Sequence, residues 1–260
     1  MISNTPNNST TGRVTLIGAG PGDPDLITLK GIKALQQADV VLHDALASTS
    51  LLAYCKPDCL VVNVGKRFGQ HSCNQDVINH LIVEYAQQYG KIVRLKGGDP
   101  FIFGRGYEEL EYAQRFGIEV EVVPGISSSY AVPALAGIPL TTRGMSESFW
   151  VITGTTKEHK LSADVALAAQ SSATVVVLMG MHKLAEIVEI YAQLGKINLP
   201  VAIIQNGSLP NEKIVTGKVG NILQLVQATG ISSPAIIVLG EVAKLSEVKQ
   251  KVALYNDSYK

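Results

Sequence analysis

The chain has 260 residues, of which 46% are hydrophobic and 17% are charged. This composition supports a sizeable core and excludes a globally disordered chain. Lysine plus arginine and aspartate plus glutamate number 22 each, so the formal net charge is zero. Balanced charge argues against a nucleic-acid-binding or anionic-membrane-binding surface, although an acidic ligand would need only a few cations in a pocket.

The N-terminus, the apolar stretches and the cysteines point to a cytoplasmic protein. Residues 1–12 are polar, do not resemble a secretory signal and are expected to form a flexible tail. The longest apolar stretches, such as 173–181, fall short of the roughly 20 residues of a membrane-spanning helix. Cys55, Cys59 and Cys73 have no histidine cluster beside them, so we favour reduced thiols over a zinc site and predict no metal.

Strand-like and helix-like segments alternate along the first half of the chain. Leu29, Ile32 and Leu35 are apolar at helical spacing, and the helix that follows Asn74 or Ser72 is expected to stop at Gly90. The expected strands are 13–20, 39–44, 59–65, 91–100 (ending in glycines) and 118–125, and the expected helices are 28–38, 74–90, 106–117 and 127–137.

The pattern restarts after residues 138–143. Strands are expected over 148–154, 173–180, 201–207, 214–219 and 235–242, and helices over 161–170, 183–195 and 221–230. The alternation predicts an α/β protein with parallel sheets covered by helices, in two consecutive α/β lobes at 13–140 and 141–250, followed by a tail at 251–260. Two such lobes make a cleft between them the natural ligand site.

The first glycine-rich loop resembles a dinucleotide-binding loop only in part. Gly18 and Gly20 fit that fingerprint, but Asp23 stands where its third glycine should be. Pro21 and Pro24 stiffen the loop and remove two N–H donors, and the helix starts only near residue 28. A nicotinamide or flavin cofactor is therefore not favoured.

Comparable loops follow other strands, at 96–100, 123–129, 178–180 and 205–208. Glycine lets the backbone approach a ligand closely, and the carboxyl ends of parallel strands share the edge where ligands bind. Because these loops combine glycine with Pro, Asp, Ser or Asn, they suggest a rigid polar pocket for a nucleoside or amino-acid group, without a phosphate clamp.

These motifs together resemble the tetrapyrrole methylases. The similarity spans roughly 13–245 and rests on "GAGPGDPDLITLKG", "VGKR", "VRLKGGDPFIFGRG", "VVPGISS" and "AGIPLTTRG". The resemblance implies a homodimer of two-lobed chains with an active-site cleft and S-adenosylmethionine as methyl donor. It implies uroporphyrinogen III as acceptor, methylated at C2 and C7 to give precorrin-2, the entry to sirohaem and cobalamin. Since 260 residues leave no room for an appended oxidase or ferrochelatase lobe, we expect a monofunctional transferase.

The resemblance also implies which residues bind the methyl donor. Asp99 could instead cap its own loop, and Met179 could instead be an ordinary core residue after an apolar strand. The residues implied to line the donor site are Pro21, Gly97, Gly98, Asp99, Ile102, Ser127, Ser128, Met179 and Gly207.

Five further residues are implied to handle protons or bind the acceptor. By resemblance Asp44 is the proton acceptor and Lys66 the proton donor, whereas Arg105, Glu108 and Arg143 serve substrate binding and proton handling. Without the resemblance, Asp44 would be a cap or turn residue, and Glu108 an acid favoured by the helix dipole. The sequence leaves open which residue is the base.

The chain departs from the family pattern at a few positions. Ala45 stands where arginine is frequent, Tyr107 where glycine is usual and Thr142 where histidine is usual, and "QNG" replaces "ENG". A sister methylase acting on a later precorrin is the nearest alternative. A NAD-dependent oxidoreductase and a non-catalytic dimeric binding module are alternatives of other classes.

Overall fold

The computed structural model describes residues 12–65 and 74–246. The chain divides after Ser127 into two compact units, which we call unit 1 and unit 2. The sequence-based boundary at residue 140 falls later, because helix α4 (Ser128–Leu135) and Ile138 pack into a core cluster of unit 2. Outside the described residues lie 1–11 of the expected tail at 1–12, the expected tail at 251–260, Lys66 and Cys73.

Unit 1 contains a five-stranded sheet of order β3-β2-β4-β1-β5. Every neighbouring pair of strands is parallel, as the alternating pattern predicts. The strands are β1 (Arg13–Gly18), β2 (Val40–His43), β3 (Leu60–Asn63), β4 (Lys91–Lys96) and β5 (Glu119–Val123). The helices are α1 (Leu29–Leu35), α2 (Gln75–Tyr89) and α3 (Gly106–Arg115), with 3-10 helices η1 (Pro24–Leu26) and η2 (Thr49–Tyr54).

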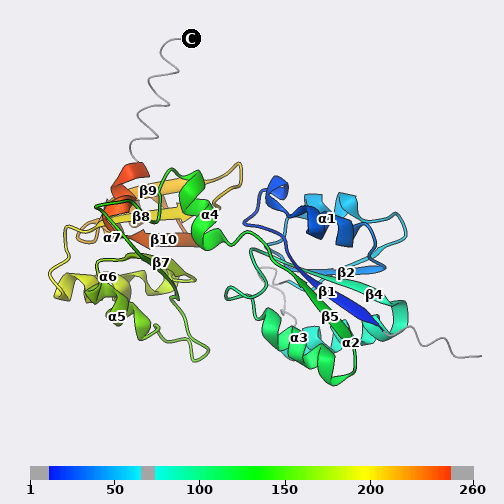
Figure 1. Ribbon diagram of the computed structural model, residues 1–260. Coiled ribbons are helices and arrows are strands. Elements are labelled where there is room, and N and C mark those ends of the chain that lie inside the picture. The colour runs from blue at the N-terminus through cyan, green and yellow to red at the C-terminus, as the bar shows by residue number, and fades with distance from the viewer. Residues whose placement is uncertain (1–11, 66–73, 247–260) are drawn as a thin grey trace, which may run out of the picture. The chain divides into compact units, whose positions relative to one another are not determined.

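The two faces of this sheet carry separate core clusters. Figure 1 shows α1 on one face and α2 and α3 on the other. Successive strand side chains point to opposite faces. On β4, Ile92 packs in the cluster beneath α2 and α3, whereas Val93 and Leu95 pack in the cluster on the α1 side. The same alternation places Arg94 and Lys96 on the face that α2 and α3 cover.

Unit 2 contains a second five-stranded sheet, of order β6-β7-β10-β8-β9. Its strands are β6 (Phe149–Thr153), β7 (Thr174–Leu178), β8 (Pro200–Gln205), β9 (Lys213–Lys218) and β10 (Ala235–Leu239). With α4, its helices are α5 (Asp164–Gln170), α6 (Leu184–Gln193) and α7 (Ile222–Thr229), and its 3-10 helices are η3 (Met181–Lys183) and η4 (Glu241–Leu245).

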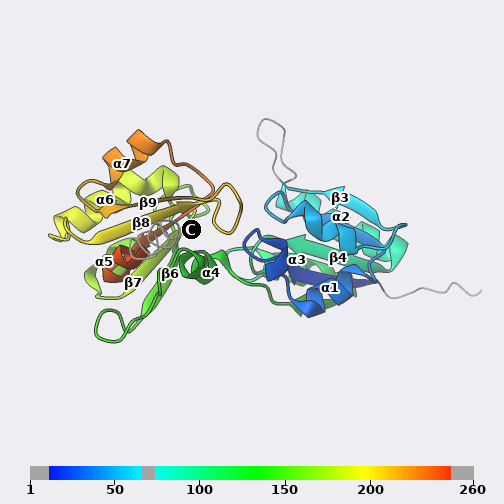
Figure 2. The same ribbon diagram turned by 90° about the horizontal axis from the view of Figure 1, so that it is seen from above.

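The expectation of a parallel sheet is wrong for unit 2. Only β6 and β7 are parallel, because β10 runs antiparallel to both β7 and β8, and β8 runs antiparallel to β9. Strands β7 and β8 therefore point the same way on either side of β10, so their carboxyl ends still share one edge. Figures 1 and 2 show α4 on one face of the sheet and α5 and α6 on the other.

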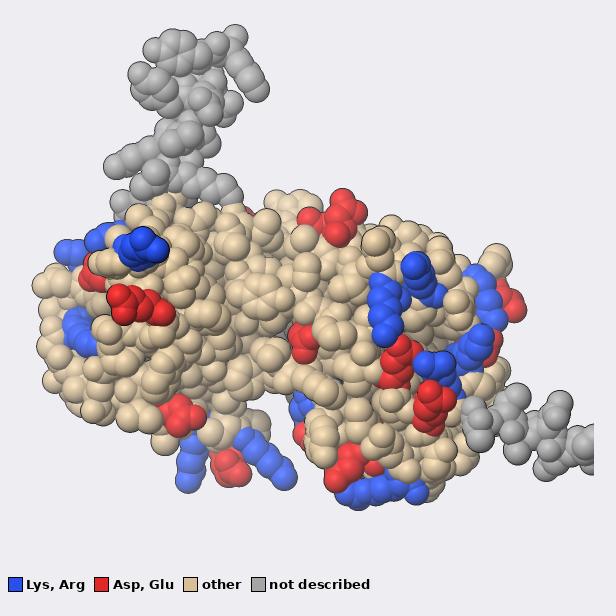
Figure 3. Space-filling model, in the orientation of Figure 1, with Lys and Arg blue, Asp and Glu red and all other residues tan. Residues whose placement is uncertain are grey.

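The described helices contain no candidate membrane span, and the face drawn in Figure 3 carries charges of both signs. None of the helices within 12–65 and 74–246 is long and apolar enough to cross a bilayer. Figure 3 shows basic and acidic side chains interspersed on the visible face.

Candidate active site

Three glycines meet at the carboxyl edge of the unit 1 sheet. Gly18 ends β1, Gly98 follows β4 and Gly125 follows β5. A Cβ atom on Gly125 would lie 2.3 Å from the Gly98 carbonyl oxygen and 2.5 Å from the Gly18 Cα atom. Side chains essentially never approach a backbone that closely, so only glycine allows these three loops to converge. We call this contact the glycine junction (Gly18, Gly98 and Gly125).

The first loop is not built to hold a pyrophosphate. The Gly20 N–H donates to the Gly98 carbonyl at 3.2 Å, and the Gly98 N–H donates back at 2.7 Å, so both donors are used inside the protein. Helix α1 starts only at Leu29, and the Thr28 hydroxyl accepts from the Gly31 N–H. The loop therefore offers no helix N-terminus directly after its glycines, which a dinucleotide site requires.

Asp99 fixes the loop after β4. One of its carboxylate oxygens accepts from the Phe101 N–H at 2.8 Å, and the other accepts from the Gly125 N–H at 2.9 Å. The loop-capping interpretation is thus confirmed by these contacts. Since each carboxylate oxygen can accept more than one hydrogen bond, Asp99 keeps acceptor capacity for a ligand hydroxyl or ammonium group.

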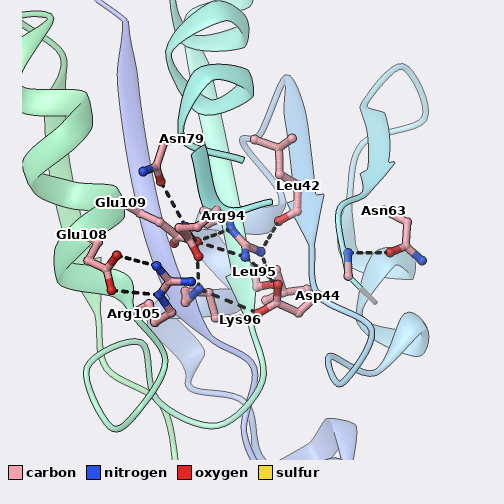
Figure 4. Close-up of polar contacts among 12 residues, drawn as sticks. Leu42, Asp44, Asn63, Asn79, Arg94, Leu95, Lys96, Arg105, Glu108 and Glu109 are labelled. Carbon is pink, nitrogen blue, oxygen red and sulfur yellow. Dashed lines mark hydrogen bonds and ion pairs between the residues drawn. The ribbon is translucent and has the colours of Figure 1, made fainter. Parts of the chain in front are cut away.

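Four charged side chains form a network below this edge (Figure 4). We call Asp44, Arg94, Lys96 and Glu109 the charge quartet. Arg94 Nη2 lies 2.5 Å from Asp44 Oδ1 and 3.2 Å from Glu109 Oε1. Lys96 Nζ lies 3.0 Å from Glu109 Oε1 and 3.8 Å from Asp44 Oδ2. Removing one member of such a buried network typically costs about 3–5 kcal/mol, because it leaves a charge without compensation.

Burial differs sharply within the quartet. At most 4% of the side chain is exposed for Arg94, Lys96 and Glu109, but 28% is exposed for Asp44. Burial first, and then the charge of Arg94, lowers the pKa of the Lys96 ammonium below its ordinary value. Glu109 Oε2 is buried without a hydrogen-bond partner among the described residues. Asp44 is thus the member that a ligand can reach.

Sequence reasoning missed Arg94, Lys96 and Glu109, although each breaks a local pattern. Arg94 and Lys96 occupy the alternate positions that share a strand face with buried Ile92. Glu109 lies between the buried residues Gly106 and Ala113 on the inward side of α3. A charged residue on a buried face must be paired, so the alternation of β4 could have marked Arg94 and Lys96 as buried charges, although it does not identify their partners.

Arg105 and Glu108 form a separate pair at the start of α3. Arg105 Nε donates to Glu108 Oε1 at 2.8 Å, and Arg105 Nη2 donates to Glu108 Oε2 at 2.6 Å. Both side chains are about half exposed, so the pair contributes little to stability. It presents a guanidinium that a substrate carboxylate could engage. Beside it, Tyr107 is exposed and contacts Phe101 edge to face, with ring centroids 6.5 Å apart.

The remaining expected donor residues of unit 1 follow the same loops. Pro21 follows Gly20, Gly97 lies against Leu46, and Ile102 is exposed on the loop that Asp99 fixes. Gly65, the residue before Lys66, packs directly against Ala45, because a Cβ on Gly65 would lie 2.0 Å from the Ala45 nitrogen. At Gly65, the last described residue before the gap, the chain therefore lies against the turn that follows Asp44.

In unit 2 the expected donor residues lie at the edge shared by β7 and β8. Met179 follows β7 and is 53% exposed, so the core interpretation of this methionine is wrong. Its carbonyl accepts from the Thr155 hydroxyl at 3.0 Å, which ties it to the loop after β6. Gly207 follows β8, and a Cβ there would lie 2.2 Å from Val132 of α4, the helix that begins at Ser128.

Strained backbone gathers in these strand-end loops. Non-glycine residues with positive φ cost free energy and cluster at functional sites. Six described residues show it, and all of them follow strands: Phe103 and Arg105 after β4, His159 after β6, Met179 after β7, and Asn206 and Ser208 after β8. Two carboxyl edges, one in each unit, therefore carry the marks of a binding site.

Arg143, Ser127 and the cysteines complete the expected set. Arg143 is exposed in a turn closed by hydrogen bonds between Thr142 and Ser146, and Ser127 is buried before α4. Within 12–65 and 74–246, Cys55 and Cys59 are unpaired, and no group of His, Cys, Asp or Glu is arranged to hold a metal ion.

The sequence and the fold of this chain match those of a known class. Residues 13–223 match the model of the tetrapyrrole (corrin/porphyrin) methylases, and the chain belongs to this family. The uroporphyrinogen-III C-methyltransferases of Methanocaldococcus jannaschii and Priestia megaterium are similar to it, with identities of 46% over 237 residues and 45% over 238 residues. These alignments cover 90% of this chain and 98% and 100% of the two relatives.

A longer relative and solved structures agree with this assignment. A siroheme synthase of Actinobacillus pleuropneumoniae is 47% identical over 93% of this chain, which spans 49% of that protein. A crystal structure of the uroporphyrin-III C-methyltransferase of Thermus thermophilus with S-adenosylhomocysteine has a TM-score of 0.76 at 37% identity, and covers 90% of this chain and 100% of that one. A cobalt-precorrin-4 methyltransferase has a TM-score of 0.79 at 28% identity, with coverages of 93% and 99%.

Proposed function

We propose that this protein is an S-adenosylmethionine-dependent methyltransferase that converts uroporphyrinogen III to precorrin-2 by methylation at C2 and C7. The observation that carries the proposal is that each unit has a set of strand-end loops, and that the loops of unit 1 use their backbone N–H donors internally instead of offering them to a phosphate. The chain also matches uroporphyrinogen-III C-methyltransferases over almost their whole length. The product would serve sirohaem or cobalamin synthesis.

The methyl donor is proposed to bind through residues of both units. The residue types fit it, since Asp99 keeps acceptor capacity for hydroxyl or ammonium groups, and the glycines bring backbone amides and carbonyls within reach. Exposed Met179 offers a polarisable apolar surface for an adenine ring. The proposed donor residues are Pro21, Gly97, Gly98, Asp99, Ile102, Ser127, Ser128, Met179 and Gly207.

The chemistry needs positioning more than an activated side chain. The bound donor supplies an electrophilic methyl group on a positively charged sulfur, so a carbon–carbon bond forms to an electron-rich pyrrole carbon as the sulfur–carbon bond breaks. The protein's part is to align the two molecules and exclude water. The macrocycle then carries a positive charge that it loses as a proton, and partly exposed Asp44 is the proposed acceptor.

Substrate binding is assigned to a few cations, because uroporphyrinogen III carries eight carboxylates. Arg105 already makes a two-point contact with the Glu108 carboxylate, which is the geometry that a substrate carboxylate would use. Arg143 is an exposed second cation. Lys66 remains the proposed proton donor. Arginine itself is an unsuitable base because it stays protonated in proteins.

We also propose a cytoplasmic homodimer. Its support is the family resemblance and the exposure of Phe149 and Trp150 on β6, the edge strand of the unit 2 sheet. Light scattering of the purified protein measures its mass, and a monomer at micromolar concentration would contradict the dimer.

The test of the proposed function is anaerobic turnover. Purified protein is given uroporphyrinogen III and S-adenosylmethionine with a labelled methyl group, and the product is analysed by mass spectrometry. We expect two labelled methyl groups per macrocycle. Absence of methylation, together with activity on a later precorrin, would identify a sister methylase instead. Calorimetry distinguishes the other class, since we expect binding of S-adenosylhomocysteine and none of NAD.

A further inference from the structure

The guanidinium of Arg94 is fixed from every side. Its Nε and Nη2 atoms contact Glu109 Oε1, each at 3.2 Å, and its Nη1 donates to the carbonyls of Leu42 and Leu95, each at 3.3 Å. Nη2 also donates to Asp44 Oδ1 at 2.5 Å. Since Arg94 is almost fully buried, its planar fork has one available orientation, and this orientation fixes one oxygen of Asp44.

Glu109 binds the two cations of β4 to each other. Its Oε1 atom accepts from Arg94, from Lys96 and, at 3.2 Å, from Gln75 of α2. Its Oε2 atom, equally buried, has no partner among the described residues. A carboxylate that served stability alone would share its donors between both oxygens, because a buried polar atom without a partner is costly. The arrangement instead concentrates the donors on the side that faces Arg94 and Lys96.

The quartet balances two positive charges against two negative ones, and only Asp44 reaches the surface. The charged groups that face Lys96 are Arg94 on its own strand, Asp44 after β2 and Glu109 on α3. If Glu109 lost its charge, two buried cations would share the Asp44 carboxylate. Asp44 would then be drawn toward them, and the pKa of Lys96, already lowered by burial, would fall further.

We infer that Arg94, Lys96 and Glu109 are positioning residues that hold the Asp44 carboxylate in one orientation toward the tetrapyrrole. The inference rests on the proposed function, in which Asp44 accepts the proton. It goes beyond that function because these three side chains, at most 4% exposed, would act through Asp44 rather than on the substrate directly. The chain supplies them from β4 and α3, and the alternation of β4 brings Arg94 and Lys96 to the same side as Asp44.

The test compares Glu109→Gln with Glu111→Gln in the turnover assay. The first change keeps the shape of the side chain and removes its charge. The second makes the same change on α3 at an exposed carboxylate paired with Arg115. We expect Glu109→Gln to lower kcat by up to about 100-fold, the loss that a displacement of about 1 Å can cause, with KM for S-adenosylmethionine unchanged. We also expect the high-pH limb of its rate profile to move to lower pH, whereas Glu111→Gln retains wild-type values.

A double-variant cycle separates positioning from mere stability. If Glu109 acts through Asp44, the Asp44→Asn/Glu109→Gln variant is no slower than Asp44→Asn alone. The inference would be overturned if the fold-losses in kcat of the two single variants multiplied in the double variant. Wild-type kcat in Glu109→Gln, together with a strongly lowered kcat in Asp44→Asn, would overturn it as well. Full activity of Asp44→Asn would instead refute the proposed role of Asp44 and the inference with it.

A second variant covers the case in which Glu109→Gln does not fold. Arg94→Lys keeps the positive charge but removes the fork that contacts both carboxylates. We expect the same fall in kcat with unchanged KM for S-adenosylmethionine, and wild-type kcat in this variant would contradict the inference.

Discussion

Replacing Gly125 by alanine tests whether the glycine junction shapes the donor site. The added methyl group would lie 2.3 Å from the Gly98 carbonyl oxygen, 2.5 Å from the Gly18 Cα atom and 2.7 Å from the Gly18 carbonyl carbon. All three are backbone atoms, so no side chain can rotate away, and the loops must separate. Overpacking of this kind costs about 1–3 kcal/mol, and we expect about 2–3 kcal/mol here.

This loss is large enough to measure by two methods. For a chain of this size, about 2–3 kcal/mol lowers Tm by about 4–12 °C, which circular dichroism detects. Since Gly98 belongs to the proposed donor site, we also expect the Kd of S-adenosylhomocysteine in calorimetry to rise by about tenfold or more, equivalent to about 1.4 kcal/mol.

Gly117 provides the matched control for this substitution. It follows α3 in the same unit, has φ of +72° and has nothing within 4 Å of an added Cβ. Asparagine tolerates this backbone conformation, so Gly117→Asn should retain both Tm and donor affinity. Unchanged Tm and Kd in Gly125→Ala would refute the steric reasoning and the role of the junction.

Three further variants test other parts of the molecule. Tyr191→Phe should leave the free energy of unfolding unchanged or raise it by up to about 1 kcal/mol, because the buried hydroxyl has no partner among the described residues; a clear loss in denaturant titration would contradict this. Lys30 and Arg13 lower the pKa of Glu121, so its ionised form stabilises the fold above its ordinary pKa of 4.5 and this contribution is lost as pH falls through the lowered value. Acidification from pH 5 to 3 should therefore lower the free energy of unfolding of the wild type more than that of Glu121→Gln, and the difference should be at most about 1 kcal/mol. Equal losses of unfolding free energy in the two proteins would refute this role of Glu121. Tyr107→Ala should raise KM for uroporphyrinogen III while the Kd of S-adenosylhomocysteine stays constant, because the exposed ring is expected to contact the tetrapyrrole. A higher Kd of S-adenosylhomocysteine with an unchanged KM for uroporphyrinogen III would contradict this.

The local patterns predicted the helices and strands, but not every strand direction. Strand β10 (Ala235–Leu239) is continuously apolar because it is central in its sheet. A central strand has the same apolar pattern whether its neighbours are parallel or antiparallel. One signal was available for β8 and β9. Only residues 206–212 connect them, whereas a parallel crossover needs about a dozen residues or more, so this pair had to be antiparallel.

The glycine loops could be read from the sequence, but the charge quartet could not. Each glycine loop follows directly from a strand end and a local motif. The quartet depends on how α3 rotates against the sheet, which brings Glu109 to Arg94 and Lys96 while its neighbour Glu108 faces Arg105. That rotation is set by packing against the core rather than by any spacing in the sequence. The alternation of β4 marks Arg94 and Lys96 as buried charges without naming their partner.

The central claim is that the strand-end loops of this chain bind the methyl donor. The most direct measurement is a crystal structure of the protein with S-adenosylhomocysteine, grown from a preparation that methylates uroporphyrinogen III. We predict the ligand in contact with Gly97, Gly98 and Asp99 in unit 1 and with Met179 in unit 2. A ligand bound elsewhere, with these loops uncontacted in an active preparation, would contradict the account.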